Sequence, residues 1–483
     1  MMASPMSASP AEITAAAAQL PAFPLAEAAR SLQQIEAAFA EAAKRAVDLL
    51  VLPECAYPAY LLGSPEHYAE SGCLTSDQFL SRLSKLVAKA GLHAVCGFVE
   101  RRDGKLHNAA VLLGPDGAVL GVHRKSFLWG DDLKCFSPGE RIEVFDSDLG
   151  PIGIAICADL RSPEIMASLV DQGARLLAVP TCWVNVAQAS GRYSNPQPEF
   201  LIEARAREFG VPLVCANKFG MESPDLGYCG MSMIVAGDGE TLAQAEPDRE
   251  ALLVSRVKPA GTIGRDVPHW AAARILTPED PIEPAADAHR SITVAVMPDV
   301  LVETDRGRLT NPDILERLAM QNVDVVIARM IPGARSAEFE LHLRAMRMTA
   351  ITAPSECRVM YEPFGSFGCV EAEQMMSFAP LRALALDGAA LLVALSAPDE
   401  PTVLRARAME NRCWLAATHD RGATIVAPNG VITACGSAAD PEPVVATLDL
   451  NDAANKLVFA NTHIWNQRRP EVYAAATHMG LDV

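Results

Sequence analysis

The stretch GPIGIAICADLRSPEIMASLVDQGARLLAVPT, residues 150–181, has the pattern that decides the fold class. It begins with a short apolar run ending at Cys157, continues with a helical segment starting at Ser162-Pro163, and closes with a second apolar run. Short apolar runs on either side of a helical segment are typical of strands buried in a parallel sheet. Serine followed by proline often begins a helix, with the serine at the cap and the proline in the first turn. The stretch therefore predicts a strand, a helix and a parallel strand.

The segments before this stretch have the same alternating order. Residues 13–20 and 47–54 are apolar runs, and residues 23–46 between them are rich in Ala, Leu, Glu and Gln with helical periodicity. Residues 106–124, LHNAAVLLGPDGAVLGVHR, contain two apolar runs separated by PDG, a common turn sequence. The chain is therefore predicted to be an α/β protein.

The pattern restarts after residue 290, which indicates two homologous domains. Three anchors recur in the same order: VDLLVLPE (47–54) with VDVVIARM (323–330), Gly153 and Gly173 with Gly368 and Gly388, and IVAGDG (234–239) with IVAPNG (425–430). The expected domains are residues 1–270 and 291–483, joined by a linker at 271–290 that includes the Pro-, Asp- and Ala-rich stretch TPEDPIEPAADAHR (277–290). A repeat of this length predicts two tandem domains of one fold.

The composition excludes several classes of partner and site. A formal charge of −18 argues against nucleic acid and anionic membranes as partners, because both attract basic surfaces. No apolar run approaches the roughly 18 residues of a membrane helix, and the first twenty residues lack a basic signal region, so a cytoplasmic location is expected. The 12 cysteines form no CxxC pair and no metal-ligand spacing, so no metal site is expected from them.

Three residues at predicted strand ends have the chemistry of acyl transfer. Cys157 and Glu54 each end an apolar run, and Lys125 ends the second strand of the PDG hairpin. Ligands bind at the carboxyl ends of strands in open α/β sheets. A thiol nucleophile, a carboxylate base and an ammonium that stabilises an oxyanion, helped by the backbone N–H of Ala158, make a complete set. A buried cysteine with an unrelated Glu–Lys surface pair is the alternative.

Three segments in order resemble the nitrilase superfamily, the carbon–nitrogen hydrolases that use a Glu-Lys-Cys triad. These segments are LVLPE, HRKSFLW with FSPGE close behind, and ICADLRSPE, and the resemblance extends over residues 13–258. It implies that Glu54 is the base, Lys125 the oxyanion lysine and Cys157 the nucleophile. Many members have a second glutamate before the FxPG segment. Asp132 stands at about that place, and Asp131 is an equal candidate.

The second copy resembles the family only in its frame. Met330 stands where Glu54 does, Ala372 stands where Cys157 does, and no lysine occurs between Lys258 and Lys456. We therefore expect a catalytically inactive homologue. The resemblance implies two tandem αββα sandwiches that pack as an intrachain pseudo-dimer, with the RRPEVY tail at that interface. It leaves open a homo-oligomer built on the pair.

The residues next to the nucleophile indicate the reaction. Cys157-Ala158-Asp159 is more similar to the Cys-Tyr-Asp of amidases and carbamoylases than to the Cys-Trp-Glu of nitrilases. The expected reaction is hydrolysis of a small linear amide through a Cys thioester, releasing ammonia or an amine. This chemistry requires neither a metal nor an organic cofactor. Nitrilase, N-carbamoyl amino acid hydrolase and acyltransferase activities remain alternatives, as does a non-catalytic binding or assembly protein.

A segment after a strand end is predicted to line the substrate pocket. Trp183 and Asn185 lie in PTCWVNVAQASGRYSN, directly after the run that ends at Pro180. Arg192, in the same segment, is a candidate to bind a substrate carboxylate, and a solvated loop arginine is the alternative. The sequence does not identify the substrate.

Overall fold

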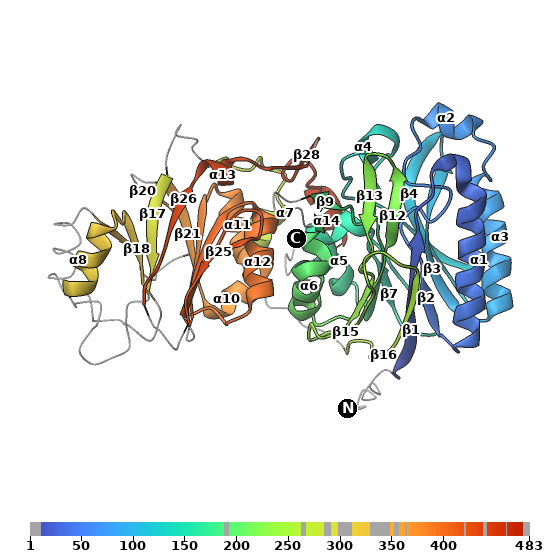
Figure 1. Ribbon diagram of the computed structural model, residues 1–483, viewed down its shortest axis with the longest axis horizontal. Coiled ribbons are helices and arrows are strands. Elements are labelled where there is room, and N and C mark those ends of the chain that lie inside the picture. Colours follow the sequence, from blue (N-terminus) through green and yellow to red (C-terminus); the bar gives the residue numbers. More distant parts are fainter. Residues whose placement is uncertain are drawn as a thin grey trace, which may run out of the picture. The chain divides into compact units, whose positions relative to one another are not determined.

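The computed structural model describes residues 11–187, 193–261, 267–284, 291–297, 312–328, 348–351, 357–362, 365–419, 422–437, 442–459 and 461–476 (Figure 1). These residues form two compact units. The first unit contains the described residues up to 261 together with 459 and 461–476, which we name the C-terminal segment, and the second contains the described residues from 267 to 458. Within these ranges, no helix is long and apolar enough to cross a membrane.

The first sheet of the first unit has the strand order β13-β12-β1-β2-β3-β4-β5, with β16 also paired to β1. Strands β1, β2 and β3 are parallel, and β3, β4 and β5 are antiparallel. The strands are β1 (Ile13–Pro21), β2 (Leu49–Val51), β3 (His93–Arg102), β4 (Lys105–Leu113), β5 (Val119–Arg124), β12 (Lys218–Ser223), β13 (Leu226–Cys229) and β16 (Ala251–Val257). Strands β4 and β5 form the predicted hairpin at PDG.

The second sheet of this unit has the order β15-β14-β11-β8-β7-β6, in which β7, β8 and β11 are parallel. Its strands are β6 (Val144–Phe145), β7 (Ile152–Ile154), β8 (Leu176–Pro180), β11 (Leu213–Ala216), β14 (Met233–Val235) and β15 (Thr241–Gln244), and the pair β9 (Val186–Ala187) and β10 (Tyr193–Ser194) is separate. The predicted strand, helix and parallel strand of residues 150–181 are β7, α5 (Pro163–Asp171) and β8.

Helices cover the outer faces of both sheets (Figure 1). Helices α1 (Ala28–Lys44) and α3 (Ser76–Ala90) pack on the first sheet, and α5 and α6 (Ile202–Phe209) pack on the second. Apolar side chains on one stripe of α1 and α3 fill the layer between helices and strands. The unit is therefore an αββα sandwich. The shorter helices are η1 (Leu25–Glu27), α2 (Pro65–Glu70), α4 (Asp132–Cys135), η2 (Cys157–Arg161), η3 (Gln197–Leu201) and α14 (Pro470–Ala476).

Helix α5 begins where the sequence predicts, with one difference at its cap. Ser162 is the cap residue and Pro163 the first helical residue. The Ser162 hydroxyl donates to Glu164 Oε2 at 2.8 Å instead of accepting a bond from the helix backbone. The predicted cap position is therefore confirmed, while the hydroxyl bonds a nearby carboxylate, which is a stronger acceptor than the backbone.

The second unit repeats the strand order of the first. Its sheet β20-β21-β22-β23-β24-β25 matches β6-β7-β8-β11-β14-β15 in strand order and in the direction of every pair, and β26-β17-β18-β19 matches β16-β1-β2-β3. The strands are β17 (Ser291–Val296), β18 (Val325–Ile327), β19 (Thr349–Ile351), β20 (Val359–Glu362), β21 (Gly365–Glu371), β22 (Leu391–Leu395), β23 (Trp414–His419), β24 (Gly422–Val426), β25 (Ile432–Cys435) and β26 (Val444–Asp449). The part of this unit that the structure describes has no counterpart of the β4–β5 hairpin.

Helices also cover both faces of the second unit (Figure 1). Helix α8 (Pro312–Met320) lies on one side, and α11 (Phe378–Leu386) and α12 (Pro401–Asn411) lie on the other. The remaining elements are α7 (His269–Leu276), α10 (Ala372–Met376), α13 (Asn451–Ala454), β27 (Leu457–Phe459) and β28 (Thr462–His463), of which β28 belongs to the C-terminal segment.

The register of the two copies agrees with the offset seen in the sequence. Gly173 and Gly388 follow helices α5 and α11 and have nearly the same left-handed φ, 93° and 92°. Ala372 begins α10, as Cys157 begins η2. Met330 lies outside the described residues. The predicted domain limits and the predicted intrachain pseudo-dimer stay predictions.

Candidate active site

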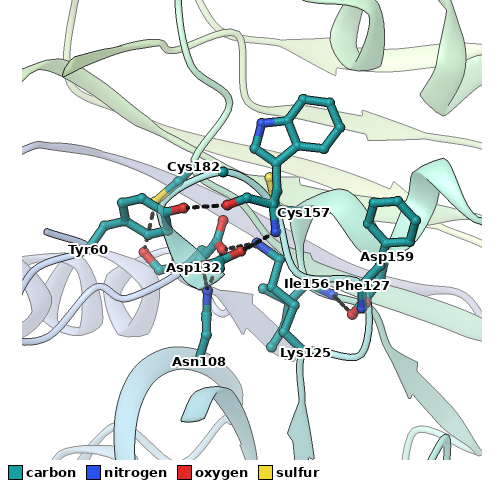
Figure 2. Close-up of polar contacts among 12 residues, drawn as sticks. Tyr60, Asn108, Lys125, Phe127, Asp132, Ile156, Cys157, Asp159 and Cys182 are labelled. Atoms are coloured by element: carbon teal, nitrogen blue, oxygen red, sulfur yellow. Dashed lines mark hydrogen bonds and ion pairs between the residues drawn. The ribbon is translucent and has the colours of Figure 1, made fainter. Parts of the chain in front are cut away.

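Two carboxylates enclose one lysine in the interior of the first unit. Glu54 follows β2 and Lys125 follows β5, so the strand ends bring them to the same edge of the sheet. The Lys125 Nζ lies 2.7 Å from Glu54 Oε1 and 2.7 Å from Asp132 Oδ2. Asn108 of β4 donates through Nδ2 to the same two carboxylates, at 2.6 Å to Glu54 and 3.1 Å to Asp132 (Figure 2). All four side chains are buried, and we name them the carboxylate–lysine cluster.

The structure distinguishes the two candidate aspartates. Asp132 is fully buried at the start of α4, and its Oδ2 also accepts a hydrogen bond from the backbone N–H of Trp129 at 2.9 Å. Asp131 forms an ion pair with Lys134, and both side chains are exposed. Asp132, and not Asp131, therefore belongs to the cluster.

The charges of the cluster keep Lys125 protonated. Burial alone would lower the pKa of this lysine, but the carboxylates of Asp132 and Glu54 raise it well above its usual value. Glu54 uses only Oε1 in these contacts. Its Oε2 is buried and has no hydrogen-bond partner among the described residues, so this oxygen can accept a proton.

Cys157 lies in a strained turn directly after the short strand β7. Its φ of 46° is in the left-handed region, which costs a non-glycine residue about 1–2 kcal/mol. Burial, and then the Glu54 carboxylate, raise the pKa of the thiol above its usual range. The resting cysteine is therefore a neutral thiol, and it needs a base at the moment of attack.

The Asp159 carboxylate hydrogen-bonds both the backbone that follows Lys125 and the backbone that precedes Cys157. The sequence did not indicate this role. The carboxylate is fully buried and has four donors at 2.8–3.0 Å: the backbone N–H groups of Ser126, Phe127 and Ile156, and Nε2 of His123. Figure 2 shows Asp159 beside Phe127 and Ile156. The first two amides follow Lys125, and the third precedes Cys157. Both oxygens are thus used within the fold, and the side chain fixes the position of the lysine relative to the cysteine.

The predicted pocket residues have different positions. Trp183 is fully buried, and its Nε1 donates to Gln197 Oε1 at 3.0 Å, while Gln197 Nε2 donates to the Cys157 carbonyl at 2.8 Å. The Asn185 side-chain amide donates to the Tyr228 carbonyl at 3.3 Å. Arg192 lies outside the described residues. Trp183 is therefore linked to the Cys157 backbone by two hydrogen bonds through Gln197, a residue that no sequence motif indicates.

Two further side chains, which no sequence signal indicates, donate hydrogen bonds to backbone carbonyls at or next to the carboxylate–lysine cluster. The Cys182 thiol donates to the Glu54 carbonyl at 3.2 Å, and the Tyr60 hydroxyl donates to the Trp129 carbonyl at 3.3 Å (Figure 2). Across the residues that the structure describes, no group of three or more His, Cys, Asp or Glu side chains could hold a metal ion.

Comparisons with known proteins identify the family of this chain. The crystal structure of an amidase from Nesterenkonia sp. aligns with 26% identity and a TM-score of 0.45, covering 53% of this chain and 94% of that one. An omega-amidase of Xenopus laevis is 30% identical over 222 residues, which is 44% of this chain and 77% of that protein. The N-carbamoylputrescine amidase of Arabidopsis thaliana is 30% identical over 189 residues, 37% of this chain and 63% of that protein. A sequence model of the carbon-nitrogen hydrolase family matches residues 14–263. The chain therefore belongs to the carbon–nitrogen hydrolases of the nitrilase superfamily.

Proposed function

We propose that the first unit hydrolyses a small linear amide through a thioester on Cys157. The observation that carries the proposal is the buried carboxylate–lysine cluster beside a protonated thiol, with Oε2 of Glu54 able to accept a proton. The relatives named as an omega-amidase and an N-carbamoylputrescine amidase support an amide as substrate.

The first half of the reaction forms the thioester. The Cys157 sulfur attacks the amide carbonyl carbon while its proton passes to Glu54. The tetrahedral oxyanion is stabilised by the Lys125 ammonium and by the N–H of Ala158, which is in the first turn of η2, where amides have no partner within the helix. The carbon–nitrogen bond then breaks, and Glu54 returns the proton to the departing ammonia or amine.

The second half releases the acid. Glu54 takes a proton from a water molecule, whose oxygen attacks the thioester carbonyl through a second oxyanion at the same donors. The carbon–sulfur bond breaks, and Cys157 recovers its proton from Glu54. Asp132 does not exchange protons in this scheme; its charge keeps Lys125 ionised and in place.

The second unit is proposed to be non-catalytic. Ala372 stands where Cys157 does, and a methyl group cannot act as a nucleophile. In the first unit, Asn108 lies on β4 and Lys125 follows β5, and the described part of the second unit has neither strand. Trp183 is proposed to form a wall of the pocket, because its link through Gln197 ends at the Cys157 carbonyl. Asn185 and Arg192 remain predictions.

An assay of ammonia and acid release on small linear carboxamides, N-carbamoyl amines, N-carbamoyl amino acids and nitriles tests the proposal. We expect turnover of a carboxamide, loss of all turnover in Cys157→Ala, and a thioester adduct on Cys157 by mass spectrometry after acid quench. Cys96→Ala is the matched control, since Cys96 is buried in β3 of the same unit, outside the cluster. Turnover that persists in Cys157→Ala refutes the mechanism, and hydrolysis of nitriles alone refutes the amide substrate.

A further inference from the structure

The C-terminal segment contacts the loop that carries Asp132. The Thr462 hydroxyl accepts a hydrogen bond from the backbone N–H of Gly130 at 2.8 Å, in a buried position. The Phe459 ring stacks on the ring of Trp129, with 5.7 Å between centroids and 21° between planes. Residues 129–132, which we name the acid loop, are therefore held by residues more than three hundred positions later in the chain.

Gly130 and Trp129 connect this contact to the rest of the acid loop. Gly130 has φ of 53°, and a Cβ at this position would lie 2.9 Å from two ring carbons of Phe459, so both the backbone conformation and the close approach favour glycine. Trp129 donates its N–H to Asp132, and the Arg161 guanidinium lies 4.2 Å from the centroid of its ring. The tryptophan thus connects the C-terminal segment to the acid and to the end of the cysteine helix η2.

Two further contacts reach the other parts of the site. Arg469 donates to the Gly139 carbonyl at 3.4 Å, and the Gly139 N–H donates to the Lys125 carbonyl at 2.8 Å. The hydroxyls of Tyr473 and Ser162 lie 3.3 Å apart, and α14 packs against α5, the helix that follows the cysteine turn. The segment therefore contacts the surroundings of the acid, the lysine and the nucleophile.

We propose that the C-terminal segment is a positioning element for the reaction: it holds the acid loop in the conformation in which Asp132 meets Lys125. This inference rests on the proposed function. A buried N–H that loses its acceptor is costly, so without Thr462 the loop relaxes toward conformations that satisfy Gly130 by other means. Displacing Asp132 moves the lysine that faces the oxyanion. Displacements of about 1 Å in such groups can lower rates by about 100-fold.

Variants of the full-length chain test this role. Thr462→Val removes the acceptor and keeps the shape, Thr462→Ser restores a hydroxyl, and Asn466→Ala changes an exposed residue of the same segment. Phe459→Leu is the second variant, because Phe459 is 44% exposed and its loss spares the core. We expect Thr462→Val and Phe459→Leu to lower kcat about tenfold with KM within about twofold. Amide hydrogen exchange should rise at least about tenfold in peptides spanning residues 126–136, and not in β1–β3.

The control variants should behave like the wild type in both measurements. Unchanged exchange in the acid loop of Thr462→Val and Phe459→Leu overturns the inference, as does faster exchange with unchanged kcat. A loss of activity that Thr462→Ser does not restore, or that accompanies faster exchange throughout β1–β3, shows a purely structural role and also overturns it. If the wild type hydrolyses no amide, the proposed function fails separately, and the exchange data alone decide whether the segment holds the loop.

Discussion

Replacing Asp159 by asparagine is expected to destabilise the first unit and to lower its activity. The change keeps the size of the side chain and replaces one acceptor oxygen by an NH₂ donor. Each carboxylate oxygen of Asp159 accepts two hydrogen bonds. In either orientation of the asparagine amide, its NH₂ group therefore points at two hydrogen-bond donors that had an acceptor in the wild type.

The two orientations differ in cost. With the NH₂ in place of Oδ1, the N–H groups of Ser126 and Phe127 both lose their acceptor. With the NH₂ in place of Oδ2, His123 can present an unprotonated Nε2, and only the Ile156 N–H loses its acceptor. A hydrogen bond to a charged group contributes about 1.5–3 kcal/mol, so the better orientation costs about 2 kcal/mol. This corresponds to a decrease of roughly 4–8 °C in the melting temperature of a unit of this size.

Differential scanning calorimetry of Asp159→Asn measures the effect, and Asp103→Asn is the matched control. Asp103 is exposed and has φ of 50°, a conformation that asparagine adopts readily, so the control should stay within about 0.5 kcal/mol of the wild type. The activity of Asp159→Asn should fall as well, because its carboxylate links the backbone after Lys125 to the backbone before Cys157. A melting temperature and kcat equal to those of the control would refute this account of Asp159.

Three further outcomes are expected. Asp132→Asn should lower kcat by about 100-fold in steady-state assays, while Asp131→Asn leaves it unchanged, because Asp132 contacts Lys125 and Asp131 pairs with Lys134 instead. Equal effects of the two changes would contradict the site geometry. Gly130→Ala should destabilise the first unit by about 1–2 kcal/mol in thermal unfolding, because of its left-handed φ and the nearby Phe459 ring, and a neutral result would show that the loop tolerates a side chain. Alkylation of Cys157 by iodoacetamide should increase with pH through 9 and beyond, since burial and a neighbouring carboxylate raise the thiol pKa above its ordinary value of 9.0; a plateau below pH 8 would indicate a thiolate in the resting enzyme.

Local patterns predicted much of the frame of the first unit. The apolar runs, the PDG hairpin and the Ser162-Pro163 helix start each depend on neighbouring residues, and they correspond to strands and helices at the expected positions. The structure also brings Glu54, Lys125 and Asp132 into contact, because strand and helix ends bring their residues to one edge of the sheet. Their catalytic roles remain predictions.

The residues that the sequence missed depend on packing between distant segments. Asp131 and Asp132 are neighbours of the same type, and one step along a short helix decides which is buried. Nothing in the sequence marks Asn108, within the predicted hairpin, or Gln197 as site residues, because their partners are fixed only when strands and loops meet. Asp159 was interpreted as an indicator of the substrate branch, and its four donors come from three separate places in the chain.

If the C-terminal segment positions the acid loop as proposed, the hydrogen bond between Gly130 and Thr462 also determines when a newly made molecule becomes active. The two residues are 332 positions apart, and domains generally fold N-terminal first during synthesis at about 5–20 residues per second. Gly130 therefore leaves the ribosome roughly 17–66 seconds before Thr462, the residue that supports the acid loop. A chain released early, within the second unit, would contain Cys157, Glu54 and Lys125 without that support. The order of the chain thus delays full activity until translation has passed both units.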